Sequence, residues 1–330
     1  IEGIGKIKFQ DEFDEIEYFI NNKNNDFNLT SKIDLNELAF KNQEFFKNFF
    51  PKINDEIILK KHQIEVNLNN DDLLFKGSGG IKLEKEFDKI DYSISKIGKK
   101  YNFDTKLNLN KTLLKVDYLN FKKNIDLDTK VEVIGNYEDN RDLNLDKISI
   151  LDKNSQIILS NLVLDNKKSL KKIDKIDLNY IDFENKKNQF HIRRIKKNDY
   201  ELIGSILNAN NLITNLLESK KSKKKIKIFK NNIDIRLNLS RVSIDNETIV
   251  KNLKGNLRIE NDKIIKTNIS ALFNENENLT FTINTNNNEK ITTLFSSRAR
   301  PLVRRYKFIK GYEEGYLDFY SSKRGNISTS

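Results

Sequence analysis

The beginning of this chain is written twice in its sequence. When the sequence is shifted by 74 positions, Ile1–Asn36 aligns with Phe75–Asn110 without a gap, and fourteen of the 36 aligned positions are identical. An internal repeat indicates consecutive copies of one structural unit, so it constrains the fold more than any other feature. The identities include two glycines, an aspartate and a tyrosine: Gly3/Gly77, Gly5/Gly79, Asp14/Asp88 and Tyr18/Tyr92.

Each copy of the repeat consists of short runs in which apolar and polar residues alternate. A period of two is typical of β-strands that have one apolar side and one polar side. The repeat therefore predicts an antiparallel meander, in which the glycines mark a bulge, a turn or a close approach of backbones. The runs are residues 7–9, 16–20, 27–29 and 33–35, and in the second copy 81–83, 90–94, 101–103 and 107–109.

Further alternating segments follow at intervals of roughly 8–12 residues, which predicts an all-β sandwich, a barrel or an extended sheet. Residues 37–50 fit either a short helix that Pro51 ends or two strands, and the second copy favours strands. The other expected strands are 56–68, 112–121, 131–137, 147–151, 156–164, 175–183, 189–195, 225–229, 232–244, 256–260, 263–273, 278–285 and 316–320.

Two segments break the strand pattern and predict short helices. Residues 209–219 carry apolar residues at helical spacing after Asn208, a favourable N-cap. A second helix is expected from Ala299 to Tyr306, where Pro301 is tolerated in the first turn. We therefore expect one region over residues 1–220, which holds the repeat and ends in the first helix, and a further region over residues 221–330.

The sequence shows no set of residues typical of a catalytic site. It has no cysteine, and its two histidines, His62 and His191, lie far apart. The glycine-rich stretch 77–80 precedes a predicted strand, so it does not form a phosphate loop at a helix N-terminus. We expect a protein that is not an enzyme and uses no metal or cofactor, with His62 exposed on a strand.

The net charge of +11 favours an anionic partner, but the abundance of Lys, Asn and Ile is the residue usage of an AT-rich genome. No apolar run approaches the roughly 18 residues that cross a bilayer. Because the chain lacks methionine and begins at Ile1, we expect an internal piece of a longer protein. Lys220–Lys225 is expected to be a solvated hinge.

Two blocks of the sequence resemble the AsmA-like superfamily of bacterial envelope proteins, and within it the large YhdP-type members. In residues 200–219 the matching positions are Gly204, Leu207, Ala209 and Leu212, while Asn208 stands where an aspartate is common. In residues 296–320 they are Ala299, Leu302, Arg304, Gly315 and Leu317. Arg298 replaces the usual acid and Arg300 the usual glycine of that block.

The resemblance implies a mostly β fold, in which a long antiparallel meander with two short helices curls into a groove. It also implies a periplasmic location, with an inner-membrane anchor outside this stretch of sequence. The implied role is non-enzymatic transport of phospholipid between the inner and outer membranes, with acyl chains as the partner. Neither the resemblance nor the residues indicate an oligomeric state.

The apolar sides of the repeated strands are the candidate lipid-binding lining. Two alternatives stay open: a structural or adhesive β-repeat scaffold with a closed core, and a basic nucleic-acid-binding module. The module would use Lys220–Lys225 with Arg298, Arg300, Arg304 and Arg305, although no nucleic acid is expected. The candidate lining residues are Ile7, Phe9, Ile16, Tyr18, Ile81, Leu83, Ile90, Tyr92, Leu107, Leu109, Leu114 and Val116.

Overall fold

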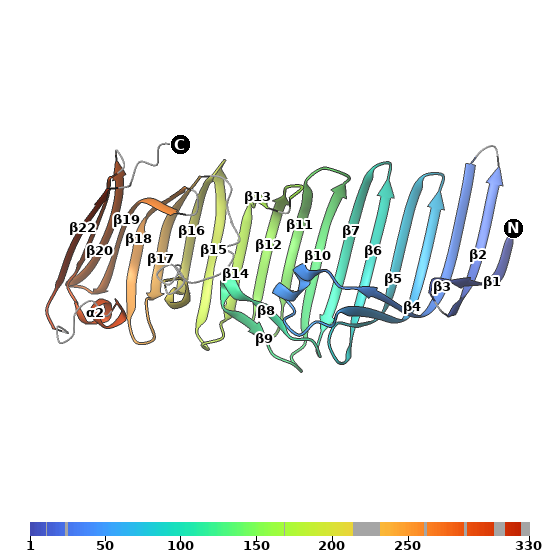
Figure 1. Ribbon diagram of the computed structural model, residues 1–330, viewed down its shortest axis with the longest axis horizontal. Coiled ribbons are helices and arrows are strands. Elements are labelled where there is room, and N and C mark those ends of the chain that lie inside the picture. The colour runs from blue at the N-terminus through green and yellow to red at the C-terminus, as the bar shows by residue number, and fades with distance from the viewer. Residues whose placement is uncertain are drawn as a thin grey trace. The chain divides into compact units, whose positions relative to one another are not determined.

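The chain folds mostly into β-strands, as the alternation predicts (Figure 1). It divides into two compact units. Unit 1 is Ile1–Lys168 with Asp182–Glu184, and unit 2 is Ser169–Ile181 with Asn185–Ser330. The expected boundary at residue 220 lies outside the described residues. The computed structural model describes residues 1–10, 12–23, 26–167, 169–213, 232–260, 263–286, 289–306 and 314–324.

Unit 1 is an antiparallel meander in which each strand of the sheet pairs with the strand that precedes it in this sheet. Among the described strands, the first one pairs only with the second, so the sheet has a free edge there. The strands are β1 (Glu2–Lys8), β2 (Phe13–Lys23), β3 (Asp26–Lys41), β4 (Glu56–Asn69), β5 (Asp72–Lys82), β6 (Phe87–Ile97), β7 (Lys100–Leu109), β10 (Thr129–Glu138), β11 (Leu143–Leu151) and β12 (Gln156–Leu164).

Two segments leave this sheet. The first, between β3 and β4, contains the 3₁₀ helix η1 (Glu44–Asn48). The second, between β7 and β10, contains β8 (Leu114–Val116), the 3₁₀ helix η2 (Asp117–Leu119) and β9 (Phe121–Lys123). β8 and β9 form a separate two-stranded sheet. The single strand expected over 112–121 is therefore wrong, and in 37–50 a strand is followed by a 3₁₀ helix.

The sequence repeat is also a repeat of strand pairing. Gly3 pairs with Tyr18 across β1 and β2, and Gly77 pairs with Tyr92 across β5 and β6. Every pair between β2 and β3 likewise recurs between β6 and β7 with both residue numbers raised by 74. Because backbone register decides which side chains share a face, the two copies have the same faces as well as similar sequences.

The repeating unit has a fourth strand that sequence alignment does not detect. β3 pairs with β4 through Ile33 and Ile64, and the equivalent residue of β7, Leu107, pairs with Val131 of β10. β10 thus stands where β4 stands, but at an offset of 67 (131 − 64) because the connecting segments differ in length. Each copy is therefore a four-stranded unit with an insertion before its last strand.

Unit 2 is a mixed sheet. From β14 to β22 each strand is antiparallel to its predecessor, except that β16 and β17 are parallel. Its elements are β13 (Leu170–Lys172), β14 (Lys175–Ile181), β15 (Lys187–Lys196), β16 (Asp199–Asn208), β17 (Ile233–Ser243), β18 (Ile249–Glu260), β19 (Lys263–Asn274), β20 (Glu277–Asn286), β21 (Glu289–Ser296), α2 (Arg300–Tyr306) and β22 (Leu317–Arg324).

Both expected helices have described residues. Residues 210–213 are helical, and the rest of the helix expected over 209–219 lies outside the described residues. The helix expected at 299–306 is confirmed as α2, which holds Pro301 in its first turn. The strand expected at 225–229 lies outside the described residues, as does Lys220–Lys225.

Candidate functional site: the apolar face of unit 1

One side of the unit 1 sheet is lined by apolar side chains across seven strands. Cross-strand partners in an antiparallel sheet project to the same side, so the register assigns each residue to a face. We name this side the apolar face and the opposite side, with its rows of charged residues, the polar face. The apolar face comprises Ile7, Ile16, Tyr18, Ile33, Ile64, Val66, Phe75, Ile90, Tyr92, Ile94, Phe103 and Leu107.

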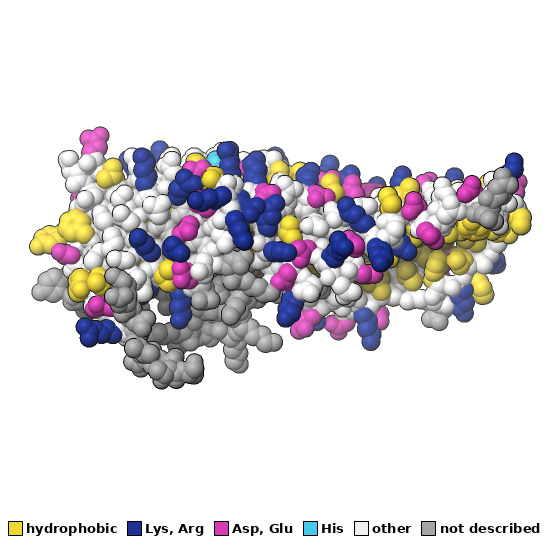
Figure 2. All heavy atoms as spheres, turned by 90° about the horizontal axis from the view of Figure 1, so that it is seen from above, with side chains coloured by type: hydrophobic (Ala, Val, Ile, Leu, Met, Phe, Trp, Pro, Cys, Tyr) yellow, Lys and Arg dark blue, Asp and Glu magenta, His cyan; other side chains and the backbone are white. Residues whose placement is uncertain are grey.

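Burial along the apolar face is uneven. Ile33 and Ile64 are buried together with Leu35, and these three residues of β3 and β4 form a core cluster. Towards the other ends of the strands the side chains are only half-buried, and Ile94 is 37% exposed. Figure 2 shows hydrophobic side chains gathered over the N-terminal strands, on the side away from a row of Lys, Asp and Glu. The apolar face is therefore a filled core at one end and an uncovered surface at the other.

The candidate lining residues fall into three groups. Ile7, Ile16, Tyr18, Ile90, Tyr92 and Leu107 lie half-buried on the apolar face. Ile81, Leu83, Leu109 and Leu114 are almost fully buried, so they belong to the protein's own core. Phe9 is exposed beyond the end of β1, and Val116 lies in β8 with Leu114, outside the main sheet. The structure thus brings together six of the predicted residues on one half-open surface.

The filled end is closed by the two segments that leave the sheet. The Lys115 N–H of β8 donates to the Phe49 carbonyl beside η1, with N and O 2.8 Å apart. The Asn54 N–H donates to the Leu83 carbonyl just after β5, also at 2.8 Å. Figure 1 shows β8 and β9 towards one end of the strands. The side chains that these segments bury are Phe50, Ile53, Leu113, Leu114 and Phe121.

A buried network of charges fixes the second of these segments. The Asp88 carboxylate accepts the N–H groups of Asn110, Lys111 and Thr112 at 2.6, 2.8 and 3.0 Å. On the same turn the Lys123 ammonium donates to the carbonyls of Asn110 and Thr112, both at 2.8 Å. Burial lowers the pKa of Lys123 from its usual 10.5, and the carboxylates of Asp88 and its neighbours partly offset that shift. These bonds end β7 and turn the chain out of the sheet, which explains why no long strand follows Asn110.

The repeated glycines allow a ring to lie against the neighbouring strand. A Cβ on Gly3 would meet the Tyr18 hydroxyl oxygen at 2.8 Å, and a Cβ on Gly77 would overlap the Tyr92 ring. The sequence signal for this arrangement is the joint repetition of the glycine and the tyrosine. At Gly3 and Gly77 the close contact is with a side-chain ring, whereas the sequence-based alternatives were a bulge, a turn or a close approach of backbones.

His62 is buried, so the expectation of an exposed histidine is wrong. Its side chain is 1% exposed, lies over Gly79 and stacks on Tyr92 with ring centroids 5.8 Å apart. Nε2 is 2.8 Å from the Gly80 carbonyl, which can only accept, so Nε2 carries the proton and Nδ1 accepts the Tyr92 hydroxyl at 3.2 Å. Burial raises the pKa of Tyr92. The sequence feature that indicates this burial is spacing: His62 and Ile64 are two residues apart on β4, so their side chains lie on the same face of the sheet.

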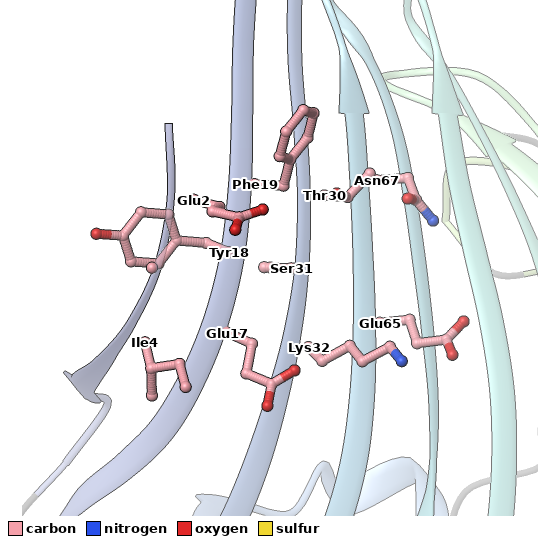
Figure 3. Close-up of a pocket in the computed structure, with 11 residues that line it drawn as sticks. Glu2, Ile4, Glu17, Tyr18, Phe19, Thr30, Ser31, Lys32, Glu65 and Asn67 are labelled. Atoms are coloured by element: carbon pink, nitrogen blue, oxygen red, sulfur yellow. The ribbon is translucent and has the colours of Figure 1, made fainter.

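A hollow with a volume of about 550 Å³ lies at the N-terminal strands (Figure 3). Most of its lining belongs to the polar face, where Ile4, Glu17, Lys32 and Glu65 stand side by side in register. It therefore shares only Tyr18 with the predicted apolar lining. The residues that line it are Glu2, Gly3, Ile4, Glu17, Tyr18, Phe19, Thr30, Ser31, Lys32, Glu65 and Asn67.

Of the basic residues considered for nucleic-acid binding, Lys220–Lys225 and the side chain of Arg305 lie outside the described residues. Arg298 pairs with Glu277 at 2.5 Å, and Arg304 approaches Glu247 at 3.9 Å. Within the described part of the chain, no three His, Asp or Glu side chains are placed to hold a metal ion. None of the described helices combines the length and apolar character needed to span a membrane.

The fold and the surface together define unit 1 as an open β-meander with one apolar face. Comparison with known proteins adds no relative: no family model, no curated protein and no solved structure matches this chain. The resemblance to the AsmA-like superfamily therefore stays a prediction.

Proposed function

We propose that unit 1 is a non-enzymatic lipid-conduit segment whose apolar face receives phospholipid acyl chains. The observation that carries the proposal is the set of half-buried apolar side chains that the apolar face carries on β1, β2 and β4 to β7. The AsmA-like resemblance supplies the rest of the proposal: a periplasmic location, an anchor in the inner membrane, and transport of phospholipid between the inner and outer membranes.

The dimensions of the apolar face suit an acyl chain. Seven strands at about 4.8 Å spacing form a band roughly 30 Å across. A bilayer core of about 30 Å implies roughly 15 Å for one acyl chain in its leaflet, so the band is long enough for a whole chain. Each methylene removed from water contributes about 0.8 kcal/mol. Half-buried side chains can thus hold a chain without any polar contact to it.

The test is the amount of phospholipid that co-purifies with two matched variants. Ile94→Asp places a carboxylate on the apolar face, whereas Ile97→Asp makes the same change at the end of β6 on the polar face, where the side chain is 60% exposed. We expect Ile94→Asp to co-purify with several-fold less phospholipid than the wild type, as measured by mass spectrometry, and Ile97→Asp to co-purify with the wild-type amount. Equal amounts of lipid in two variants with wild-type circular dichroism would contradict the proposal.

A structural scaffold is the second candidate, and the closed end of the apolar face favours it. Ile81, Leu83 and Leu109 are at most 6% exposed, so that end needs no ligand to be covered. Because the chain has no cysteine, Ile94→Cys and Ile97→Cys each provide one attachment point for an environment-sensitive dye. A lipid-binding face predicts a response to phospholipid from the dye at position 94 only, and a scaffold predicts none.

A further inference from the structure

A lysine stands on the apolar face at its open end. Lys96 of β6 pairs with Leu73 of β5 and with Tyr101 of β7, so its side chain projects to the same side of the sheet as theirs. Among the described residues that the register places on this face, Asp14 and Asp88 are buried at the filled end, and Lys96 is the charged residue at the open end. Lys96 therefore places a positive charge beside apolar and aromatic side chains.

No described residue of the chain balances the charge of Lys96. Its side chain is half-buried, and its ammonium group forms neither an ion pair nor a hydrogen bond with the described residues. On the polar face of the same strands, by contrast, Lys89 pairs with Asp91 at 3.4 Å and Lys106 with Glu132 at 3.6 Å. Because a half-buried charge without a counter-ion costs free energy, position 96 favours an anionic group from outside the chain.

The fold of the repeating unit does not require this charge. In the first copy the equivalent pair is Asn22 with Phe27, in the same register as Lys96 with Tyr101. The strands of the first copy thus pair in the same way with a neutral side chain at this position. Strand pairing therefore does not account for the lysine.

Two tyrosines continue the row of Lys96 on the next two strands. Tyr101 pairs with Lys96 and with Tyr137 of β10, which is 38% exposed. Tyrosine suits a boundary between an apolar phase and water, because its ring is apolar and its hydroxyl is polar. The next row inwards holds Ile94 and Phe103, which have no polar group in their side chains. The open end thus changes from polar to apolar within one row, as a phospholipid does between its head group and its acyl chains.

We propose that Lys96 is the head-group contact of the apolar face, where its ammonium group donates hydrogen bonds to the phosphate of a phospholipid. The proposal rests on the function proposed above and adds the orientation of the lipid, whose acyl chain lies along the strands from Lys96 towards the filled end. Lys96 and Ile90 are six residues apart on β6 (96 − 90), which is about 20 Å at about 3.4 Å per residue. An acyl chain of about 15 Å fits within this length and ends before the buried Leu109.

The test compares two lipids that have the same acyl chains and differ in the head group. Dihexanoylphosphatidylglycerol and dihexanoylglycerol, which lacks the phosphate, are titrated into the full chain below the concentrations at which they aggregate, and binding is measured by calorimetry. We expect the wild type to bind the phospholipid about tenfold more tightly, because a hydrogen bond between two charged groups distinguishes the two lipids. Lys96→Gln should abolish most of this preference and leave the affinity for dihexanoylglycerol unchanged.

Two variants and one ion are the controls. Lys96→Arg keeps the charge and should keep the preference for the phospholipid. Lys100→Gln removes an exposed lysine of the polar face beside Tyr101 and should also keep it. Inorganic phosphate should not displace the phospholipid, because it has no acyl chain to bury.

The outcomes separate this assignment from the proposed function. An unchanged preference in Lys96→Gln, or a loss of both lipids in a Lys96→Gln variant with wild-type circular dichroism, would overturn the assignment of Lys96 and leave the proposed function standing. Inorganic phosphate that binds as tightly as the phospholipid would overturn the assignment too. If neither lipid bound the wild-type chain, the proposed function would fail together with it.

Discussion

The Asp88 carboxylate accepts the backbone N–H of Asn110 at 2.6 Å, and 74 residues earlier Asp14 accepts the N–H of Asn36 at 2.7 Å. Both aspartates are buried, at 6% and 2% exposure. A third bond of this kind joins the Asn188 side chain to the Asn208 N–H at 2.8 Å in unit 2. In each case a buried polar side chain supports the neighbouring strand immediately after a buried leucine: Leu35, Leu109 and Leu207.

The two aspartates accept different numbers of backbone hydrogen bonds. We therefore expect their removal to lower the free energy of unfolding by different amounts. Asp88 accepts three backbone N–H groups, and Asp14 accepts the single N–H of Asn36. We expect Asp88→Ala to lower the free energy of unfolding by about 3–5 kcal/mol and Asp14→Ala by about 1–3 kcal/mol, since buried donors lose a charged acceptor. Urea unfolding followed by circular dichroism measures both. Equal losses would show that the extra bonds at Asp88 add nothing.

The repeated glycines predict opposite outcomes for one substitution. Gly77→Ala would force its Cβ into the Tyr92 ring, whereas Gly5→Ala finds ordinary contacts. We expect Gly77→Ala to destabilise the protein by about 1–3 kcal/mol through overpacking. Gly5→Ala should be neutral or stabilising by up to about 1 kcal/mol, because alanine restricts the unfolded chain. Thermal unfolding of the two variants compares them directly. A double variant with Tyr92→Ala should recover part of the loss at Gly77.

Because Lys123 is buried, we expect the free energy of unfolding to rise at alkaline pH. Because burial lowers its pKa below the usual 10.5, the unfolded chain binds the proton more tightly than the folded chain. The free energy of unfolding therefore rises with pH between the lowered folded pKa and 10.5, and the cost of burying the charge is fully present below that window.

The comparison of wild type with Lys123→Met isolates this effect. We expect the wild type to gain stability relative to Lys123→Met between about pH 7 and about pH 10 in urea unfolding. Lys130→Met, at an exposed site on the polar face, is the control. A constant difference between wild type and Lys123→Met at the two pH values would contradict the assignment.

The uneven burial of the apolar face predicts where truncation costs most. Leu109→Ala removes a side chain with no exposed surface, and Leu35→Ala removes one in the cluster with Ile33 and Ile64. We expect each to cost about 2–5 kcal/mol in the free energy of unfolding. Ile94→Ala, on the uncovered end, should cost less than about 1.5 kcal/mol, since much of its area stays in water. Chemical unfolding of the three variants tests this gradient, and a cost at Ile94 as large as at Leu109 would mean that the open end is covered.

Much of the secondary structure was predictable from the sequence because strands and short helices follow from local patterns of residues. The strands of both repeat copies, one apolar and one polar side, and the helix at Ala299–Tyr306 all follow from periodicity and turn residues. The same rules failed over residues 112–121, where alternation continues but the backbone leaves the sheet. There the Asp88 carboxylate, 22 to 24 residues before the N–H groups that it accepts, and the Lys123 ammonium hold the turn and override the local strand preference.

The sequence by itself determined the β-strands, the duplication and the side of each strand that is apolar, because alternation with period two assigns faces residue by residue. Only the tertiary structure decided which part of the apolar face is filled, that His62 is buried over Gly79, and that β10 completes the second copy as β4 completes the first. These features depend on contacts between segments separated by insertions of different length. The hydrogen bonds that hold such segments link residues far apart in the chain, and no local pattern encodes them.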